Sequence, residues 1–187
     1  MIEHRIIERM IHVVSMELER IQKGNTIDPA FIDETVDFIR IYADMTHHGK
    51  EEDILFKALK KKELNPEISR ILNELLEEHV IGRRTVGNLA MAKEQHIHGS
   101  EKAKEIIVSK LAYLVDFYPK HIEKEDKHFF VSVMKHFSKE EQDRMLEEGY
   151  IYDRKMIHRK YDSKVLGFEE KFGIKKPKRS KNWLDYL

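Results

Sequence analysis

The chain has 187 residues, a length that favours one compact domain with an additional element over two domains. Charged residues make up 36% of the chain, but 34 basic residues balance 34 acidic ones, so no net charge favours nucleic acid or an anionic membrane surface. The absence of cysteine excludes disulfides, thiolate metal sites and thiol nucleophiles. The longest run without a charged residue, 85–92, is far shorter than the roughly 18 residues of a membrane span, so we expect a cytoplasmic protein.

Apolar residues recur at spacings of three and four, and the few glycines and prolines fall between these segments, so the sequence predicts an all-α fold. The first helix is expected over 2–23. The second begins at Asp28-Pro29, a capping residue followed by the favoured first-turn proline, and reaches about residue 62. The third follows Asn65-Pro66, and the fourth ends near residue 136. Short connections favour antiparallel neighbours, so residues 1–137 are predicted to form an up-down-up-down four-helix bundle.

A Ser-x-x-Glu capping box at 138–141 predicts a fifth helix that ends near residue 173. We expect this C-terminal helical extension, 138–173, to pack on the bundle. The rest of the chain, 174–187, is a basic and aromatic tail. The tail has few basic residues and the chain is neutral, so we expect the tail to dock on its own domain or on a second copy of the chain and not to bind nucleic acid. The sequence is therefore compatible with a homodimer.

The eleven histidines need an explanation, since the chain is otherwise rich in lysine and glutamate. An imidazole and a carboxylate four residues apart lie on one helical face and can bind the same metal. Five such pairs occur, where chance predicts about 1.4, so the excess alone is suggestive and not decisive. The pairs are His4/Glu8, His47/Glu51, His48/Glu52, His121/Glu125 and His136/Glu140.

The apolar stripes select among these residues. Continuing each stripe by three or four residues reaches six side chains, and a rise of about 1.5 Å per residue places the four histidines among them within about one helical turn of the same height. A buried layer of imidazoles and acids is costly unless divalent ions compensate it. The six predicted metal ligands are His4, His47, Glu51, His79, His121 and Glu125. The histidines that fail these criteria, His12, His48, His96, His98, His136 and His158, are expected to be solvated.

Four motifs in this order resemble the hemerythrin-like HHE cation-binding domain over about residues 3–137. They are Glu-His-Arg at His4, His47-His48-x-x-Glu51-Glu52, Glu78-His79-x-x-Gly82-Arg83 and His121-Ile122-x-x-Glu125-Asp126. The resemblance implies two iron ions, which zinc or nickel can replace, with the four predicted histidines as terminal ligands and Glu51 and Glu125 as bridges. Asp126 is the alternative bridging acid of the fourth helix, although the phase of the helix favours Glu125.

The resemblance also bears on function. Oxygen-carrying hemerythrins have a second histidine one turn after the ligand of the third helix, where this chain has Arg83. We therefore expect a protein that binds or senses O2, NO or peroxide, or that handles iron, more than a simple oxygen carrier. The alternative is a di-iron enzyme with oxidase, peroxidase, NO-reducing or iron-centre-repair activity, in which Tyr118, Tyr150 or Tyr152 would supply protons or electrons. A third interpretation treats the metal as structural and the chain as an interaction module.

Overall fold

The structure, a computed structural model, describes residues 2–171, with the side chains of 157–159 and 161–171 left out. The chain divides into two compact units, residues 1–138 and 139–187. Every regular element among residues 2–171 is a helix, and no strand occurs there, which confirms the predicted all-α fold. The predicted tail, 174–187, and the side chain of His158 lie outside the described residues.

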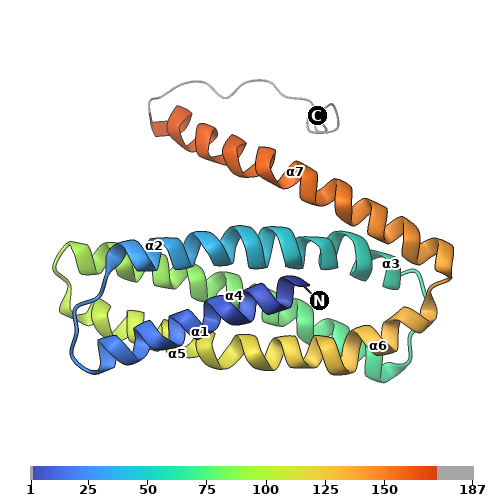
Figure 1. The fold of residues 1–187 in the computed structure, drawn as a ribbon, viewed down its shortest axis with the longest axis horizontal. Helices are drawn as coiled ribbons and strands as arrows, with labels where there is room; N and C mark the ends of the chain where they lie inside the picture. The colour runs from blue at the N-terminus through green and yellow to red at the C-terminus, as the bar shows by residue number, and fades with distance from the viewer. Residues whose placement is uncertain (1, 172–187) are drawn as a thin grey trace. The chain divides into compact units, whose positions relative to one another are not determined.

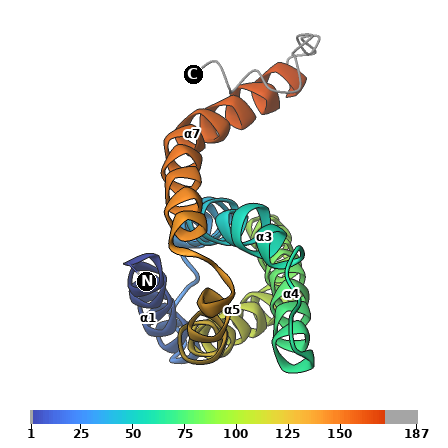
Figure 2. The same ribbon diagram turned by 90° about the vertical axis from the view of Figure 1, so that its right-hand side faces the viewer.

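Four helical rods form the first unit (Figure 1). The connections between successive rods alternate between the two ends of the unit in Figure 1, and Figure 2 shows the rods from one end. The first and third rods are single α-helices, and the second and fourth are built of several consecutive helical segments. In chain order these elements are α1 (Ile2–Gln22); α2 (Pro29–Phe38), η1 (Ile39–His48), η2 (Glu51–Phe56) and α3 (Lys57–Leu59); α4 (Pro66–Ile97); and α5 (Glu101–Glu123), η3 (Lys124–Phe129), α6 (Phe130–Val133) and η4 (Met134–His136).

The helix ends follow the capping signals of the sequence. The side chains of Asp28 and Asn65 each accept a backbone N–H of the following helix, at 2.9 and 2.8 Å, and a proline occupies the next position in both cases. Gly24 and Gly99 follow α1 and α4 with φ values of +95° and +86°, a backbone conformation that glycine adopts without steric cost. Local sequence therefore sets where three of the rods begin or end.

The predicted apolar stripes form the core of the bundle. All their members are buried, which confirms the faces that the sequence assigned to the interior. They are Ile7, Ile11, Val14, Leu18 and Ile21 of α1; Ile32, Val36, Ile39 and Ala43 of the second rod; Ile68, Leu72, Leu75, Val86 and Leu89 of α4; and Ile107, Leu111 and Leu114 of α5.

The second and fourth rods contain π-helical segments, η1, η2 and η3. At the end of η1 the N–H of Gly49 donates a hydrogen bond to the carbonyl of Asp44, five residues earlier. At the end of η3 the N–H of Phe130 donates to the carbonyl of Glu125, also five residues earlier. A π-turn holds more residues than an α-turn, so side chains four and five positions apart stay on one face. These segments contain three of the six predicted ligands, His47, Glu51 and Glu125.

The second unit is described through α7 (Lys139–Lys171), the helix that the capping box predicted. Its packing on the bundle stays a prediction.

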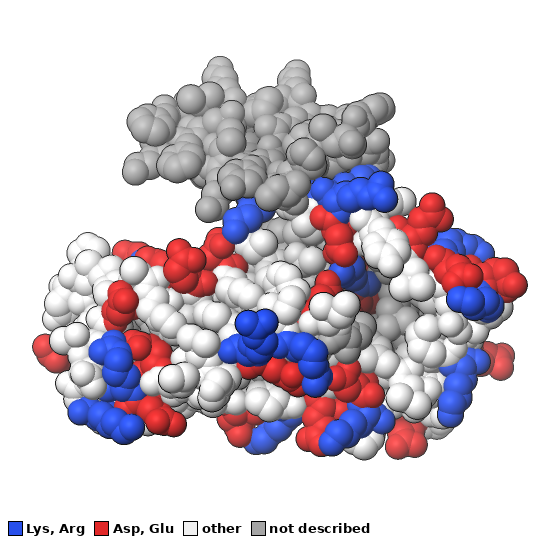
Figure 3. Space-filling view, viewed as in Figure 1, with Lys and Arg blue, Asp and Glu red and all other residues white. Residues whose placement is uncertain are grey.

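Lysine, arginine and acidic side chains are intermixed on the face of the molecule seen in Figure 3, as the neutral composition leads one to expect. Within the described residues, no helix combines the length and the apolar character that crossing a bilayer requires.

The core assignment predicts the effect of a truncation. Leu111 is fully buried in α5, so L111A leaves a cavity and is expected to lower the free energy of unfolding by about 2–5 kcal/mol. The matched control is M91A in α4, where the methionine is 58% exposed and the loss should stay within about 0.5 kcal/mol. Denaturant unfolding measures both. Equal stabilities of the two variants would contradict the assigned core.

Candidate metal centre

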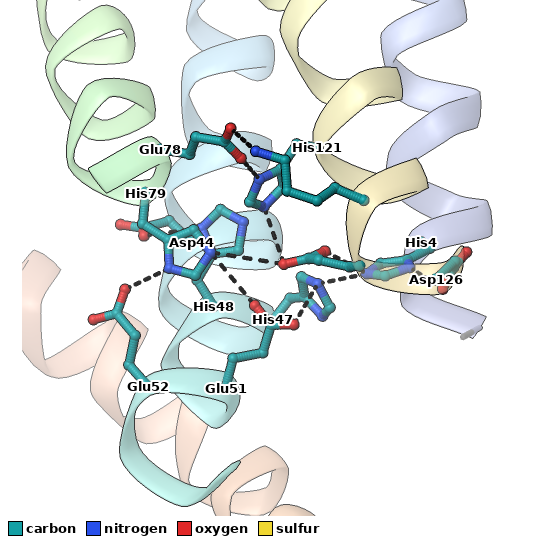
Figure 4. A network of polar contacts seen from close by, with 12 residues as sticks. His4, Asp44, His47, His48, Glu51, Glu52, Glu78, His79, His121 and Asp126 are labelled. Atoms are coloured by element: carbon teal, nitrogen blue, oxygen red, sulfur yellow. Dashed lines mark hydrogen bonds and ion pairs between the residues drawn. The ribbon is translucent and has the colours of Figure 1, made fainter. Parts of the chain in front are cut away.

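All six predicted ligands lie in one buried layer inside the first unit, and Figure 4 labels five of them, His4, His47, Glu51, His79 and His121. None has an exposed fraction above 4%, and each rod contributes at least one of them. The first rod supplies His4, the second His47 and Glu51, the third His79, and the fourth His121 and Glu125. The helical phases therefore bring together residues that are up to 121 positions apart in the chain.

The two glutamates lie between histidines of different rods. The two carboxylate oxygens of Glu125 are each 3.2 Å from an imidazole Nε2, that of His4 and that of His121. Those of Glu51 are 3.7 Å from Nε2 of His47 and 3.5 Å from Nε2 of His79. A carboxylate in such a position can place one oxygen on each of two metal ions.

Asp126, the alternative acid, lies on the outer side of the same layer. Its Oδ1 is 2.8 Å from Nδ1 of His4, and its Oδ2 accepts a hydrogen bond from Arg5 at 2.7 Å. Of the two adjacent acids, Glu125 thus faces the inner nitrogens, and Asp126 contacts the back of a histidine ring.

The same outer contact recurs around the layer. An ionised carboxylate only accepts hydrogen bonds, so its presence at Nδ1 places the proton there and leaves Nε2 as the inward-facing acceptor. Each outer acid is in turn paired with a lysine or arginine: Glu3 with Lys50, Asp126 with Arg5, Glu52 with Arg83 and Glu78 with Lys124. The distance from the histidine Nδ1 to the nearest carboxylate oxygen is 2.8 Å for His4 and Asp126, 3.0 Å for His47 and Glu3, 2.7 Å for His79 and Glu52, and 2.7 Å for His121 and Glu78.

This orientation makes acceptors meet acceptors in the interior. Nε2 of His4 lies 2.9 Å from Nε2 of His47, and with both protons at Nδ1 neither nitrogen can donate to the other. Nε2 of His79 and of His121 and the carboxylate oxygens of Glu51 and Glu125 are buried without a hydrogen-bond partner. Unpaired buried polar atoms are costly, and a cation bound among them removes the cost. The donor set, imidazole nitrogens with carboxylate oxygens, suits iron, zinc or nickel.

The pKa values of the two glutamates shift in opposite directions. Burial raises the pKa of Glu51 well above its usual range, and the charge of Glu125 raises it further. Burial also acts to raise the pKa of Glu125, but the charge of His121 and contacts with the surrounding histidines outweigh it and hold that pKa well below its usual range. Without metal, protons thus supply part of the compensating positive charge, and metal binding displaces them.

His48 was expected to be solvated, and this expectation is wrong. Its exposed fraction is 3%, and its Nε2 has no hydrogen-bond partner. The physical reason is the π-helical form of η1, whose wider turn admits two successive residues, His47 and His48, to the inner face. The sequence carried a signal: the inward positions Ile39, Ala43, His47, Glu51 and Phe56 are spaced by four, four, four and five residues, more than the 3.6 of an α-turn.

With His48 included, the ligating atoms form two groups. The first comprises His4, His47, Glu51 and Glu125, and the second comprises His48, His79 and His121. In each group the ligand atoms lie within 4.8 Å of one another. Elsewhere, His12, His98 and His128 are exposed, and His96 and His136 are half-buried.

Aromatic rings cover the histidines on several sides. Phe130 stacks on His4 with ring centroids 5.9 Å apart, Phe56 stacks on His79 at 5.9 Å, and Phe117 stacks on His121 at 5.3 Å. These rings limit the access of water, which strengthens the interaction of the layer with any bound charge.

The comparison with protein families matches residues 1–133 to the hemerythrin HHE cation-binding domain. Neither a curated protein nor a solved structure matched the chain. The matched segment covers about seven tenths of the chain and contains all six predicted ligands. The chain therefore belongs to the hemerythrin HHE cation-binding family.

Proposed function

We propose that the first unit is a non-haem di-iron protein that binds or senses O2, NO or peroxide, or that handles iron. The observation that carries this proposal is the buried layer of imidazole nitrogens and carboxylate oxygens that have no hydrogen-bond partner while carboxylates hold the backs of the same rings. Structural histidines need no such arrangement, because an inward hydrogen-bond donor would satisfy them.

The proposal of two metal ions is supported by the grouping of the ligands. One metal needs only a single set of converging atoms, whereas the layer holds two such sets. Glu125 contacts His4 of one set and His121 of the other, at 3.2 Å in both cases. Glu51 and Glu125 are accordingly proposed as the bridging acids, and His4, His47, His79 and His121 as terminal ligands.

The residues of the chain suit the binding of a small molecule. When bound, a pair of iron ions would supply electrons and open coordination positions for a diatomic ligand or a peroxide. The outer carboxylates orient the imidazoles, and the rings of Phe56, Phe117 and Phe130 keep bulk water away.

A second candidate is a di-iron enzyme with oxidase, peroxidase, NO-reducing or iron-centre-repair activity. It is favoured by Tyr118, which is buried and packs edge to face on Phe117, the ring that stacks on His121. A tyrosine in this position can pass an electron and a proton to the centre.

Metal analysis tests the proposed centre. The full chain, purified without an affinity resin and loaded anaerobically with Fe²⁺, is expected to retain two iron ions per chain after removal of free metal, because two groups of ligands are present. E51Q and E125Q should each retain less. A single metal per chain in the wild type, with both variants unchanged, would contradict the bridging assignment.

Optical spectra separate binding from catalysis. The reduced protein is expected to give a stable coloured adduct on exposure to O2 or NO if it is a binding protein or sensor. Turnover of added peroxide with a reductant would favour the enzyme instead, and Y118F should then slow turnover while leaving the iron content unchanged. No spectral change with any of the three molecules would contradict both candidates and favour a structural metal.

The outer carboxylates predict a graded loss of affinity. Glu78 accepts from Nδ1 of His121 at 2.7 Å, so E78Q removes the negative charge that orients this ring and is expected to lower metal affinity by about 10–100-fold. The matched control is E74Q, because Glu74 contacts the same lysine, Lys124, and is not among the acids that hold a ligand ring. Competition with a chelator measures the metal affinity of both variants. An equal loss of affinity in E78Q and E74Q, or no loss of affinity in either, would refute the role of Glu78.

A further inference from the structure

We propose that His48 is a fifth histidine ligand of the centre, the third imidazole of the group that it forms with His79 and His121. This inference rests on the proposed metal-binding function and adds a ligand that the six predicted residues lack. It assigns three histidines to one metal position and leaves His4 and His47, with the two glutamates, at the other.

The ring of His48 is buried against two of the predicted ligands. The side chain is 3% exposed and stacks on His79 with ring centroids 3.9 Å apart and an angle of 10° between the planes. The ring of His121 meets it edge to face at 5.4 Å. Its Nε2 is buried without a hydrogen-bond partner, like Nε2 of His79 and of His121. Three ring nitrogens thus gather without a hydrogen-bond partner among the described residues.

His48 is oriented by an acid at its outer nitrogen, as the other four buried histidines are. Its Nδ1 faces a carboxylate, Oδ1 of Asp44, at 3.4 Å. The corresponding distances for the other four rings run from 2.7 to 3.0 Å, so the contact of His48 is longer but of the same kind. A carboxylate at Nδ1 leaves the opposite nitrogen free for a metal. All five buried rings therefore share one orientation relative to the centre.

Arg83 connects the acid behind His48 with the acid behind His79. Its Nε donates to Oδ1 of Asp44 at 2.8 Å, and its terminal nitrogen donates to Oε1 of Glu52 at 2.6 Å. One guanidinium thereby holds the acids behind His48 and behind His79, the two rings that stack on each other. The residue one turn after His79 is thus a positioning residue, and the additional imidazole comes from the second rod instead of the third.

The backbone provides for this ligand at a cost. The π-helical form of η1, which is rare because α-turns are more favourable, places His47 and His48 on the inner face together. In an uninterrupted α-helix, successive residues point about 100° apart, and only one of the two would face the layer. The π-segment thus lets one rod serve both groups of ligands.

The test uses the full chain with Zn²⁺ as a diamagnetic probe and reads the imidazole ¹⁵N resonances. Zinc is expected to shift the Nε2 resonances of five histidines from the range of an unbound nitrogen to that of a metal-bound one. H48Q should remove one of these five resonances and lower the affinity for one of the two zinc ions by about 100-fold or more, since loss of a mere outer partner already costs about 10–100-fold. The control H12Q alters an exposed histidine of α1 and should change neither quantity.

The outcomes separate this inference from the proposed function. If the wild type binds zinc and only four Nε2 resonances shift, or if H48Q binds two zinc ions with wild-type affinity, His48 is not a ligand and the metal centre stands without it. If the wild type binds no metal, the proposed function fails, and this inference fails with it. Should H48Q not fold, the count of shifted resonances in the wild type decides by itself.

Discussion

The convergence of imidazole nitrogens and carboxyl oxygens inside the bundle is the constraint on which the rest of the first unit depends. Hydrophobic packing alone would fill this layer with residues such as leucine. Leu111 and Leu114, which precede His121 in α5, are examples of such packing. The layer instead holds seven titratable side chains, whose burial is unfavourable unless positive charge enters with them. The folded bundle therefore favours the binding of cations in this layer. This agrees with its membership of the HHE cation-binding family.

Charge is arranged in shells around this layer. The imidazoles point inward, carboxylates hold the outer nitrogens of the rings, and lysine or arginine side chains hold the carboxylates from the surface. The outer carboxylates thus lie between the imidazole rings and the cationic side chains of the surface. Each outer acid thus has a cationic partner as well as a ring nitrogen, which offsets the cost of taking its charge out of water.

The π-helical segments adapt the two rods that carry the glutamates. The inward residues of the fourth rod, His121, Glu125, Phe129 and Val133, follow at steps of four, which an α-helix would carry around to another face. The wider turn of η3 keeps them in line, as η1 and η2 do in the second rod. Ligands and the apolar residues beyond them thus share one face over a long stretch.

The sequence by itself determined the helices, their caps, the buried stripes and six residues that meet in one layer, because helical periodicity and the rise per residue are local properties. Only the tertiary structure decided what the assumption of a regular α-helix concealed. It brought His48 into the layer, since the backbone widens at η1. It also gave each histidine its outer carboxylate, because those partners come mostly from other rods and no spacing along one helix encodes them.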